Sequence, residues 1–151
     1  MSRIAFKFAV VATLALAVEA RAADATYEIG KTDAILTVGD KGKASVTISA
    51  RGGWHLNAEA PLTLKLAPAP GVMLDKPKFA RGDLALSNET TARFDVGLVA
   101  SEPGKKTIEA EAGFVLCQEN ACRPIKEKLV LVVEAVAPAK ASTGKKSAKK
   151  R

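Results

Sequence analysis

The sequence predicts an all-β domain, and three observations support this fold class. Apolar and polar residues alternate in several short runs, so each run would turn one face toward a core and the other toward water. Turn-forming Gly, Pro and Asp residues separate these runs, and no comparable stretch has a helical period. Short strands with frequent turns are typical of an immunoglobulin-like antiparallel β-sandwich, which is the architecture that we expect.

The first 22 residues predict a secretory signal peptide. Arg3 and Lys7 stand at the start of an apolar run, Phe8 to Val18, and Ala20-Arg21-Ala22 forms a small-x-small cleavage site. The run has 11 residues, whereas a membrane-spanning helix needs about 20, and no later segment is long enough. We therefore expect no transmembrane segment, cleavage after residue 22, and export to the periplasm or another oxidising space.

Residues 23–137 are expected to form one domain of ordinary size. The clearest alternating runs are Ala44–Ser49, Leu62–Leu66, Ala92–Leu98 and Thr107–Glu111. Turns are predicted at Gly39–Gly42, Arg51–Gly53, Pro68–Gly71 and Glu102–Lys105. The last strand is expected from about Lys126 to Val136, and its continuous apolar stretch, Leu129–Val133, predicts burial on both faces.

Positive charge is concentrated at the two ends of the chain. The whole sequence carries a net charge of +7, but residues 23–137 hold 14 basic and 15 acidic residues. Residues 138–151 contribute six positive charges and contain no large apolar residue. This composition predicts a disordered basic tail. The tail is either simply solvated or attached to an anionic envelope surface. It has no aromatic residues on which bases could stack, so we expect no specific nucleic-acid binding.

The two cysteines flank the turn of a predicted hairpin. Cys117 and Cys122 are separated by four residues and lie between two apolar, strand-like runs. A disulfide that closes so small a ring contributes only about 2 kcal/mol on the chain-entropy estimate. The pair therefore suits thiol-disulfide exchange, which needs an accessible cysteine with a resolving cysteine nearby, at least as well as it suits a structural staple. Arg123 would stabilise a neighbouring thiolate, and Glu119 would oppose it.

Two further residues are candidates for supporting roles. His55 can act as the base of a Cys-His pair or can simply pack at the start of a strand, and Trp54 is expected to be a core or edge aromatic. A blue-copper site needs two histidines and this chain has one, while tetrahedral zinc would need a ligand beyond His55 and the cysteines. We therefore expect no metal and no other cofactor.

Four segments carry a family resemblance. They are Gly53-Trp54-His55-Leu56, Ala69-Pro70-Gly71-Val72, Phe79-Ala80-Arg81-Gly82 and Cys117 to Pro124. Over roughly Gly53 to Val133 the chain resembles the N-terminal periplasmic domain of the thiol:disulfide interchange protein DsbD. The resemblance implies an immunoglobulin-like domain that relays reducing equivalents to thioredoxin-like or other dithiol/disulfide partners. It also implies that Cys117 and Cys122 are the redox pair and that Phe79 is the aromatic residue of a cap loop over the disulfide.

The chain departs from this family pattern in three ways. The best-known members have five residues between the cysteines, whereas this chain has four, and Pro77 and Lys78 replace acidic residues before the cap aromatic. The polytopic and thioredoxin-like domains of the full reductase are missing from the 151 residues, so we expect a stand-alone carrier, which is a candidate thiol:disulfide oxidoreductase. The alternative is a non-catalytic immunoglobulin-like binding or envelope-interaction module with a structural disulfide and a tethering tail.

Overall fold

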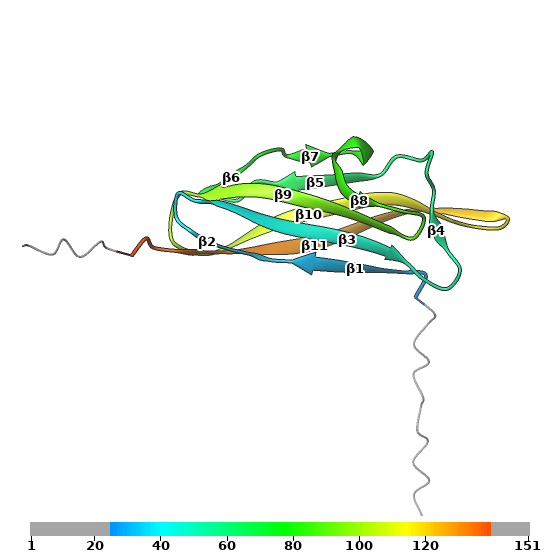
Figure 1. The fold of residues 1–151 in the computed structure, drawn as a ribbon, viewed down its shortest axis with the longest axis horizontal. Helices are drawn as coiled ribbons and strands as arrows, with labels where there is room; N and C mark the ends of the chain where they lie inside the picture. The colour runs from blue at the N-terminus through cyan, green and yellow to red at the C-terminus, as the bar shows by residue number, and fades with distance from the viewer. Residues whose placement is uncertain (1–24, 140–151) are drawn as a thin grey trace, which may run out of the picture.

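The computed structural model describes residues 25–139 as two β-sheets packed face to face (Figure 1). Sheet A has the order β1-β3-β9-β6, with β8 also paired to β9, and sheet B has the order β2-β11-β10-β5-β7, with β4 also paired to β10. The predicted β-sandwich is confirmed. The predicted signal peptide lies outside the described residues, as does the predicted tail beyond its first two residues.

The strands of sheet A are β1 (Tyr27–Thr32), β3 (Lys41–Ala50), β6 (Val72–Leu74), β8 (Leu84–Ser87) and β9 (Thr91–Ala100). Those of sheet B are β2 (Ala34–Thr37), β4 (His55–Leu56), β5 (Thr63–Ala67), β7 (Lys78–Phe79), β10 (Gly104–Gln118) and β11 (Ala121–Val136). A short 3-10 helix, η1 (Arg81–Asp83), follows β7. Among these strands every pairing is antiparallel except that of β2 with β11.

Period-two alternation in the sequence produces the core between the sheets. The predicted runs coincide with parts of β3, β5, β9 and β10, except that the run Leu62–Leu66 starts one residue before β5, and the predicted turns fall at junctions between strands. In β9 every second residue is buried, from Ala92 to Ala100, which places Phe94 at the centre of the sandwich with no exposed surface. All buried residues in the described part of the chain are hydrophobic, so the core contains no charge that needs a partner.

The last strand differs from its prediction on one face. Leu131 and Val133 are fully buried, but Val130, whose side chain points to the opposite face of the strand, is 43% exposed. The reason is that the outer face of sheet B has no further layer over it among the described residues, so the apolar stretch Leu129–Val133 is buried on one face only. The continuous apolar run therefore predicts the strand correctly and its two-sided burial wrongly.

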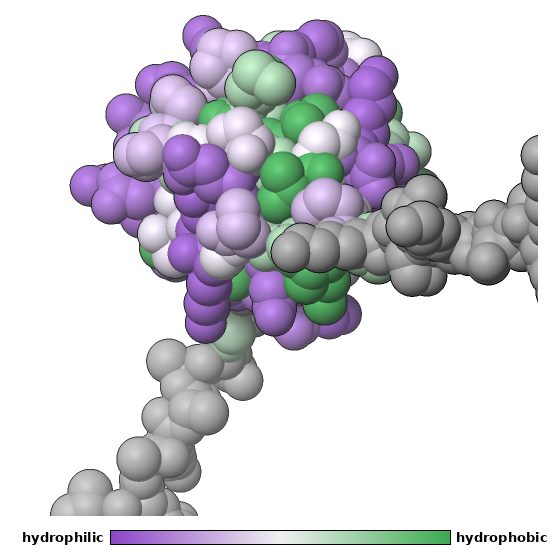
Figure 2. Space-filling model, turned by 90° about the vertical axis from the view of Figure 1, so that its left-hand side faces the viewer, coloured by the Kyte–Doolittle hydropathy of each residue, from purple (hydrophilic) through white to green (hydrophobic). Residues whose placement is uncertain are grey.

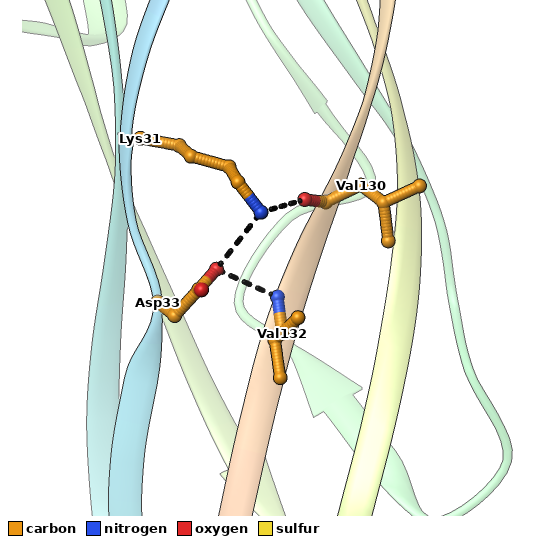
Figure 3. A network of polar contacts seen from close by, with 4 residues as sticks. All are labelled: Lys31, Asp33, Val130 and Val132. Carbon is orange, nitrogen blue, oxygen red and sulfur yellow. Dashed lines mark hydrogen bonds and ion pairs between the residues drawn. The ribbon is translucent and has the colours of Figure 1, made fainter.

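The chain changes sheets between β1 and β2, and polar side chains cover the edge of β11 at that point (Figure 3). Lys31 Nζ donates to the carbonyl of Val130 at 2.7 Å, and the N–H of Val132 donates to Asp33 Oδ1 at 2.8 Å. Lys31 and Asp33 also form an ion pair at 3.5 Å. These contacts satisfy backbone groups of an otherwise open strand edge just before β2 pairs with it.

The two ends of the sandwich differ. The β10–β11 hairpin projects beyond one end (Figure 1). At the other end, Figure 2 shows a small group of apolar side chains within a largely hydrophilic surface. The hairpin end carries both cysteines, so it is the end that positions the candidate site.

Candidate functional site

The disulfide lies near the tip of the β10–β11 hairpin. Glu119 and Asn120 form a two-residue turn, and Gln118 pairs with Ala121 across it. The next pair along the ladder is Cys117 with Cys122, whose Cα atoms are 4.1 Å apart and whose Sγ atoms are bonded at 1.98 Å. Directly opposite residues this close are typical of a non-hydrogen-bonded pair, in which the side chains approach most closely. The predicted hairpin with one thiol on each strand is confirmed.

The two sulfur-bearing residues differ in exposure. Cys117 is only 7% exposed, whereas Cys122 is exposed. The difference follows from the sheet, because β10 has β4 on its other side at Cys117, while β2 reaches β11 only at Val133–Val136. Cys122 therefore lies at an open edge. Of the two cysteines, Cys122 is the one more accessible to an attacking thiolate.

A tight turn delivers β4 to the disulfide. The N–H of Trp54 donates to the carbonyl of Arg51 at 3.1 Å, and the two residues between them are Gly52 and Gly53, with φ of 59° and 77°. Two successive left-handed residues favour glycine, because a Cβ is strained in that conformation. The predicted turn is confirmed, and it reverses the chain so that His55 starts β4.

His55 is the register partner of Cys117. β4 and β10 pair His55 with Cys117, and β10 and β11 pair Cys117 with Cys122, so the three residues form a row across three strands. Directly opposite residues point to the same face of a sheet, here the outer face of sheet B. His55 is exposed, as is Cys122. The row places a titratable side chain beside the buried cysteine, a spatial relation that the sequence alone leaves open.

Trp54 and Arg123 contact each other next to this row. The Arg123 guanidinium carbon lies 5.1 Å from the centroid of the Trp54 indole, and Trp54 packs partly buried against the core. Successive residues of a strand point to opposite faces, so Arg123 faces away from its neighbour Cys122. Its charge is engaged by the indole ring and is not directed at the disulfide.

Asn57 connects the segment after β4 to the buried cysteine. Its side-chain Nδ2 donates to Cys117 Sγ at 3.4 Å. Its Oδ1 accepts the N–H groups of Glu59 and Ala60 at 2.8 and 3.0 Å, which forms a tight Asx turn, and its own N–H donates to the carbonyl of Val115 at 2.9 Å. The Asn57 amide therefore covers the sulfur of Cys117 from the β4 side.

Arg81 holds the same segment from the other direction. Its guanidinium donates to the carbonyls of Asn57 and Ala60 at 2.6 and 2.8 Å. Arg81 is fixed by η1, where the Asp83 carboxylate accepts hydrogen bonds from Lys76 and from the N–H of Ala80. These two bonds, with Lys76 the stronger influence, hold the pKa of Asp83 below its ordinary value.

The structure places Phe79 in the core, away from the disulfide. Phe79 is 5% exposed and packs edge-on against Phe94, with ring centroids 6.1 Å apart. Its strand partner is Leu64, which pairs with Ala112, and Ala112 is five residues before Cys117 along β10. The aromatic ring of Phe79 therefore fills the interior of the sandwich, and the expected cap over the disulfide is not formed by this residue.

An open groove lies beside β4. Its volume is about 990 Å³, and residues that line it include Arg51, Trp54, His55, Asn57, Glu59 and Glu89. The described residues contain no group of three or more His, Cys, Asp or Glu side chains arranged to hold a metal ion. Over residues 25–139 there is also no helix with the length and apolar character needed to cross a membrane.

Asn57 and Arg81 are the site residues that the sequence does not single out. An Asn followed by small and polar residues after a strand is a recognisable signal for an Asx turn. Its contact with Cys117 depends on the register between β4 and β10, which a two-residue strand does not specify in the sequence. The structure thus places His55 and Asn57 beside Cys117, holds the contacting pair Trp54 and Arg123 on the opposite face of sheet B, and leaves Phe79 in the core.

No family model matches this chain, and neither does any curated protein. The fold is similar to that of a Porphyromonas gingivalis protein of unknown function, with a TM-score of 0.42 and 13% identity. The match covers 79% of this chain and 51% of that protein. WR4, an MSP family member of C. elegans, matches with a TM-score of 0.38 and 10% identity over 74% of this chain and 98% of its own. AggA, the major subunit of aggregative adherence fimbriae type I from Escherichia coli, matches with a TM-score of 0.38 and 11% identity over 73% of this chain and 94% of its own. Similarities at this level assign no function.

Proposed function

We propose that this protein is a thiol-disulfide exchange domain that cycles the Cys117–Cys122 bond with a thioredoxin-like partner. The observation that carries the proposal is the pairing of one exposed and one buried cysteine in a single cross-strand disulfide. Exchange requires a sulfur that a partner thiolate can reach and a second sulfur held beside it. Cys122 has the first property and Cys117 the second.

The exchange proceeds in two steps. A partner thiolate attacks Cys122 Sγ in line with the disulfide, the Sγ–Sγ bond breaks, and Cys117 leaves with the electron pair as a thiolate, which then takes up a proton. The resulting mixed disulfide joins the partner to Cys122. A second partner thiol, as thiolate, attacks the partner's own sulfur and releases the Cys122 thiolate. The partner dithiol is oxidised to a disulfide, and this domain is reduced to a dithiol; the reverse sequence carries electrons the other way.

The rest of the fold supports a bond that can open and close. β10 and β11 are joined by 15 register pairs, so the disulfide closes a hairpin that the ladder already defines. The core consists of hydrophobic residues of both sheets and does not include the two cysteines, which lie next to the hairpin turn. On the chain-entropy estimate, a six-residue ring adds only about 2 kcal/mol to the free energy of unfolding. Reduction should therefore leave the sandwich folded.

The family resemblance fits the same activity. We propose that the chain is a stand-alone counterpart of the N-terminal domain of DsbD and that it acts in the periplasm or another exported space, where thiol pairs are oxidised and reduced. The segments that carry the resemblance include β4 and the cysteine hairpin, which the sheet brings together. The shielding that the family assigns to a cap aromatic would here fall to Asn57 and the segment that follows β4.

Equilibration of the mature protein with reduced thioredoxin and with dithiothreitol buffers tests the proposal, with circular dichroism recorded throughout. We expect reversible reduction with an unchanged fold and a potential within about −120 to −270 mV, the range of exchange proteins. A Cys117→Ser/Cys122→Ser double variant is the matched control for the fold. Unfolding on reduction, or a potential below about −300 mV, would show a structural bond and favour the non-catalytic binding module.

A further inference from the structure

We propose that Asn57 is a catalytic residue of this exchange, donating a hydrogen bond to Cys117 Sγ as that sulfur leaves. The inference rests on the proposed function and deepens it by naming the group that stabilises the leaving thiolate. It also assigns Arg81 the role of a positioning residue, because Arg81 acts on the segment that carries Asn57 and does not contact the sulfur in the described hydrogen bonds.

The orientation of the Asn57 amide is fixed by its hydrogen bonds within the turn. Its Oδ1 accepts two backbone N–H groups, from Glu59 and Ala60, at 2.8 and 3.0 Å. A flipped amide would bring its NH₂ group against these two donors, which leaves no acceptor for them. The NH₂ end must therefore face Cys117 Sγ, 3.4 Å away. The donor is in place before the reaction begins.

The hydrogen bond gains strength as the disulfide breaks. A disulfide sulfur is a weak acceptor, whereas the departing sulfur of Cys117 carries the electron pair and a developing negative charge. Hydrogen bonds to an ionised acceptor are roughly twice as strong as neutral ones. A donor that is pre-placed where charge develops, in a site shielded from water, stabilises the transition state more than the ground state. The burial of Cys117, 7% exposed, provides that shielding.

Arg81 keeps the donor at this distance. Its guanidinium binds the carbonyls of Asn57 and Ala60 at 2.6 and 2.8 Å, at the two ends of the Asx turn. The N–H of Asn57 is bound on its other side to the carbonyl of Val115 in β10. The Asn57 backbone is thus held between η1 and the strand that carries Cys117, which limits the movement of the amide away from the sulfur.

Two substitutions of Asn57 separate a catalytic from a structural role. Asn57→Ser keeps a side-chain oxygen that can accept the turn N–H groups but replaces the amide NH₂ that reaches Cys117 Sγ with a hydroxyl on a shorter side chain. Asn57→Asp keeps the shape and the acceptor and presents a carboxylate to Cys117. Each is made in two backgrounds: the disulfide form, for its rate of reduction by dithiothreitol, and the Cys122→Ser form, for the ultraviolet absorbance of the Cys117 thiolate.

We expect Asn57→Ser to lower both the rate of reduction and the Cys117 thiolate fraction at fixed pH by about tenfold, and Asn57→Asp to lower both further. Arg81→Lys should give a smaller decrease in the same direction. Circular dichroism of each variant checks that it is folded. Folded variants whose rate and thiolate fraction equal those of the parent would overturn the inference and leave Asn57 as a turn residue only.

The two proposals fail in distinguishable ways. Reduced thioredoxin tests the exchange function on the parent protein. The dithiothreitol rate and the thiolate absorbance test Asn57 without any protein partner. If thioredoxin fails to reduce the parent while Asn57→Ser still lowers the dithiothreitol rate and the thiolate fraction about tenfold, the exchange function is refuted. That result would still support the stabilisation of Cys117 Sγ by Asn57. If thioredoxin reduces the parent, and the Asn57 variants match the parent in dithiothreitol rate and thiolate fraction, only the proposed role of Asn57 is refuted.

Discussion

The guanidinium of Arg123 lies over the indole of Trp54, with its central carbon 5.1 Å from the ring centroid. This contact joins the residue after Cys122, on β11, to the turn that starts β4, on the opposite side of β10. It braces the hairpin tip from the inner face of sheet B while the row of His55, Cys117 and Cys122 occupies the outer face. The Trp54–Arg123 contact and the row of His55, Cys117 and Cys122 therefore lie on opposite faces of sheet B.

The first prediction tests this separation. Arg123→Ala should lower the free energy of unfolding by about 0.5–1 kcal/mol, the range of an exposed cation–π contact, and should shift the emission of Trp54 to longer wavelength. Trp54 is the one tryptophan of the sequence, so a change in tryptophan fluorescence can be assigned to its surroundings. The rate of disulfide reduction should stay essentially unchanged, with Arg123→Lys as the control that retains the charge. A markedly slower reduction would show instead that Arg123 stabilises a cysteine thiolate.

The second prediction concerns the two sulfurs. With Cys117→Ser the remaining Cys122 is exposed, and with Cys122→Ser the remaining Cys117 is buried. Accessibility controls thiol reactivity, so the free Cys122 should react with a chromogenic disulfide reagent at least about tenfold faster than the free Cys117. Labelling in denaturant, where both are exposed, provides the matched control. The reverse order of rates would place the attacked sulfur at Cys117 and contradict the proposed mechanism.

The third prediction concerns Phe79, which packs against Phe94 in the core. Phe79→Leu should lower the free energy of unfolding by about 1–3 kcal/mol, because a smaller side chain leaves a cavity beside that ring. It should leave the rate of disulfide reduction by dithiothreitol unchanged, since Phe79 does not cover the sulfurs. Leu64→Ala, at the strand partner of Phe79, is the control for a general loosening of the core. Faster reduction in the Phe79 variant alone would restore a shielding role.

The parts of the fold that the sequence predicts are those whose burial alternates. β3 and β9 are long and half-buried, so their apolar residues recur at every second position, and the hairpin of β10 and β11 is marked by its cysteines and apolar strands. β4, β6 and β7 have two or three residues each, which is too few to show a period. Such strands form because their neighbours offer an edge, and the sequence does not encode that directly.

The same reason limits prediction of the site. Only four residues separate Cys117 from Cys122 in the sequence, and their pairing follows from a two-residue turn. His55 and Asn57 reach Cys117 only through the register of β4 with β10. Phe79 lies away from the disulfide because β7 pairs with β5. Residues joined by a local turn are predictable, whereas residues joined by non-local pairing become visible once the sheet is assembled.

The fourth prediction uses a hydrogen bond between the two sheets. Tyr27, on β1, donates its hydroxyl hydrogen to Glu127 Oε2, on β11, at 2.7 Å, and its ring packs edge-on against Phe114. The hydrogen bond to Glu127, followed by burial and the negative charge of Glu127, raises the pKa of Tyr27 above its ordinary value. Tyr27→Phe should keep the ring contact and lower the free energy of unfolding at neutral pH by about 1 kcal/mol.

The sign of the pH dependence follows from this raised pKa. The protonated hydroxyl stabilises the fold, so its contribution is fully present below the unfolded pKa of tyrosine, about 10, and is lost as pH rises through the higher folded pKa. Denaturant unfolding of both proteins across alkaline pH should therefore show a stability gap that closes as Tyr27 ionises. Glu127→Gln, which retains a neutral acceptor, should reduce the pH dependence while preserving part of the bond. A gap that widens with pH, or no gap at neutral pH, would show that the Tyr27–Glu127 bond does not stabilise the packing of the two sheets.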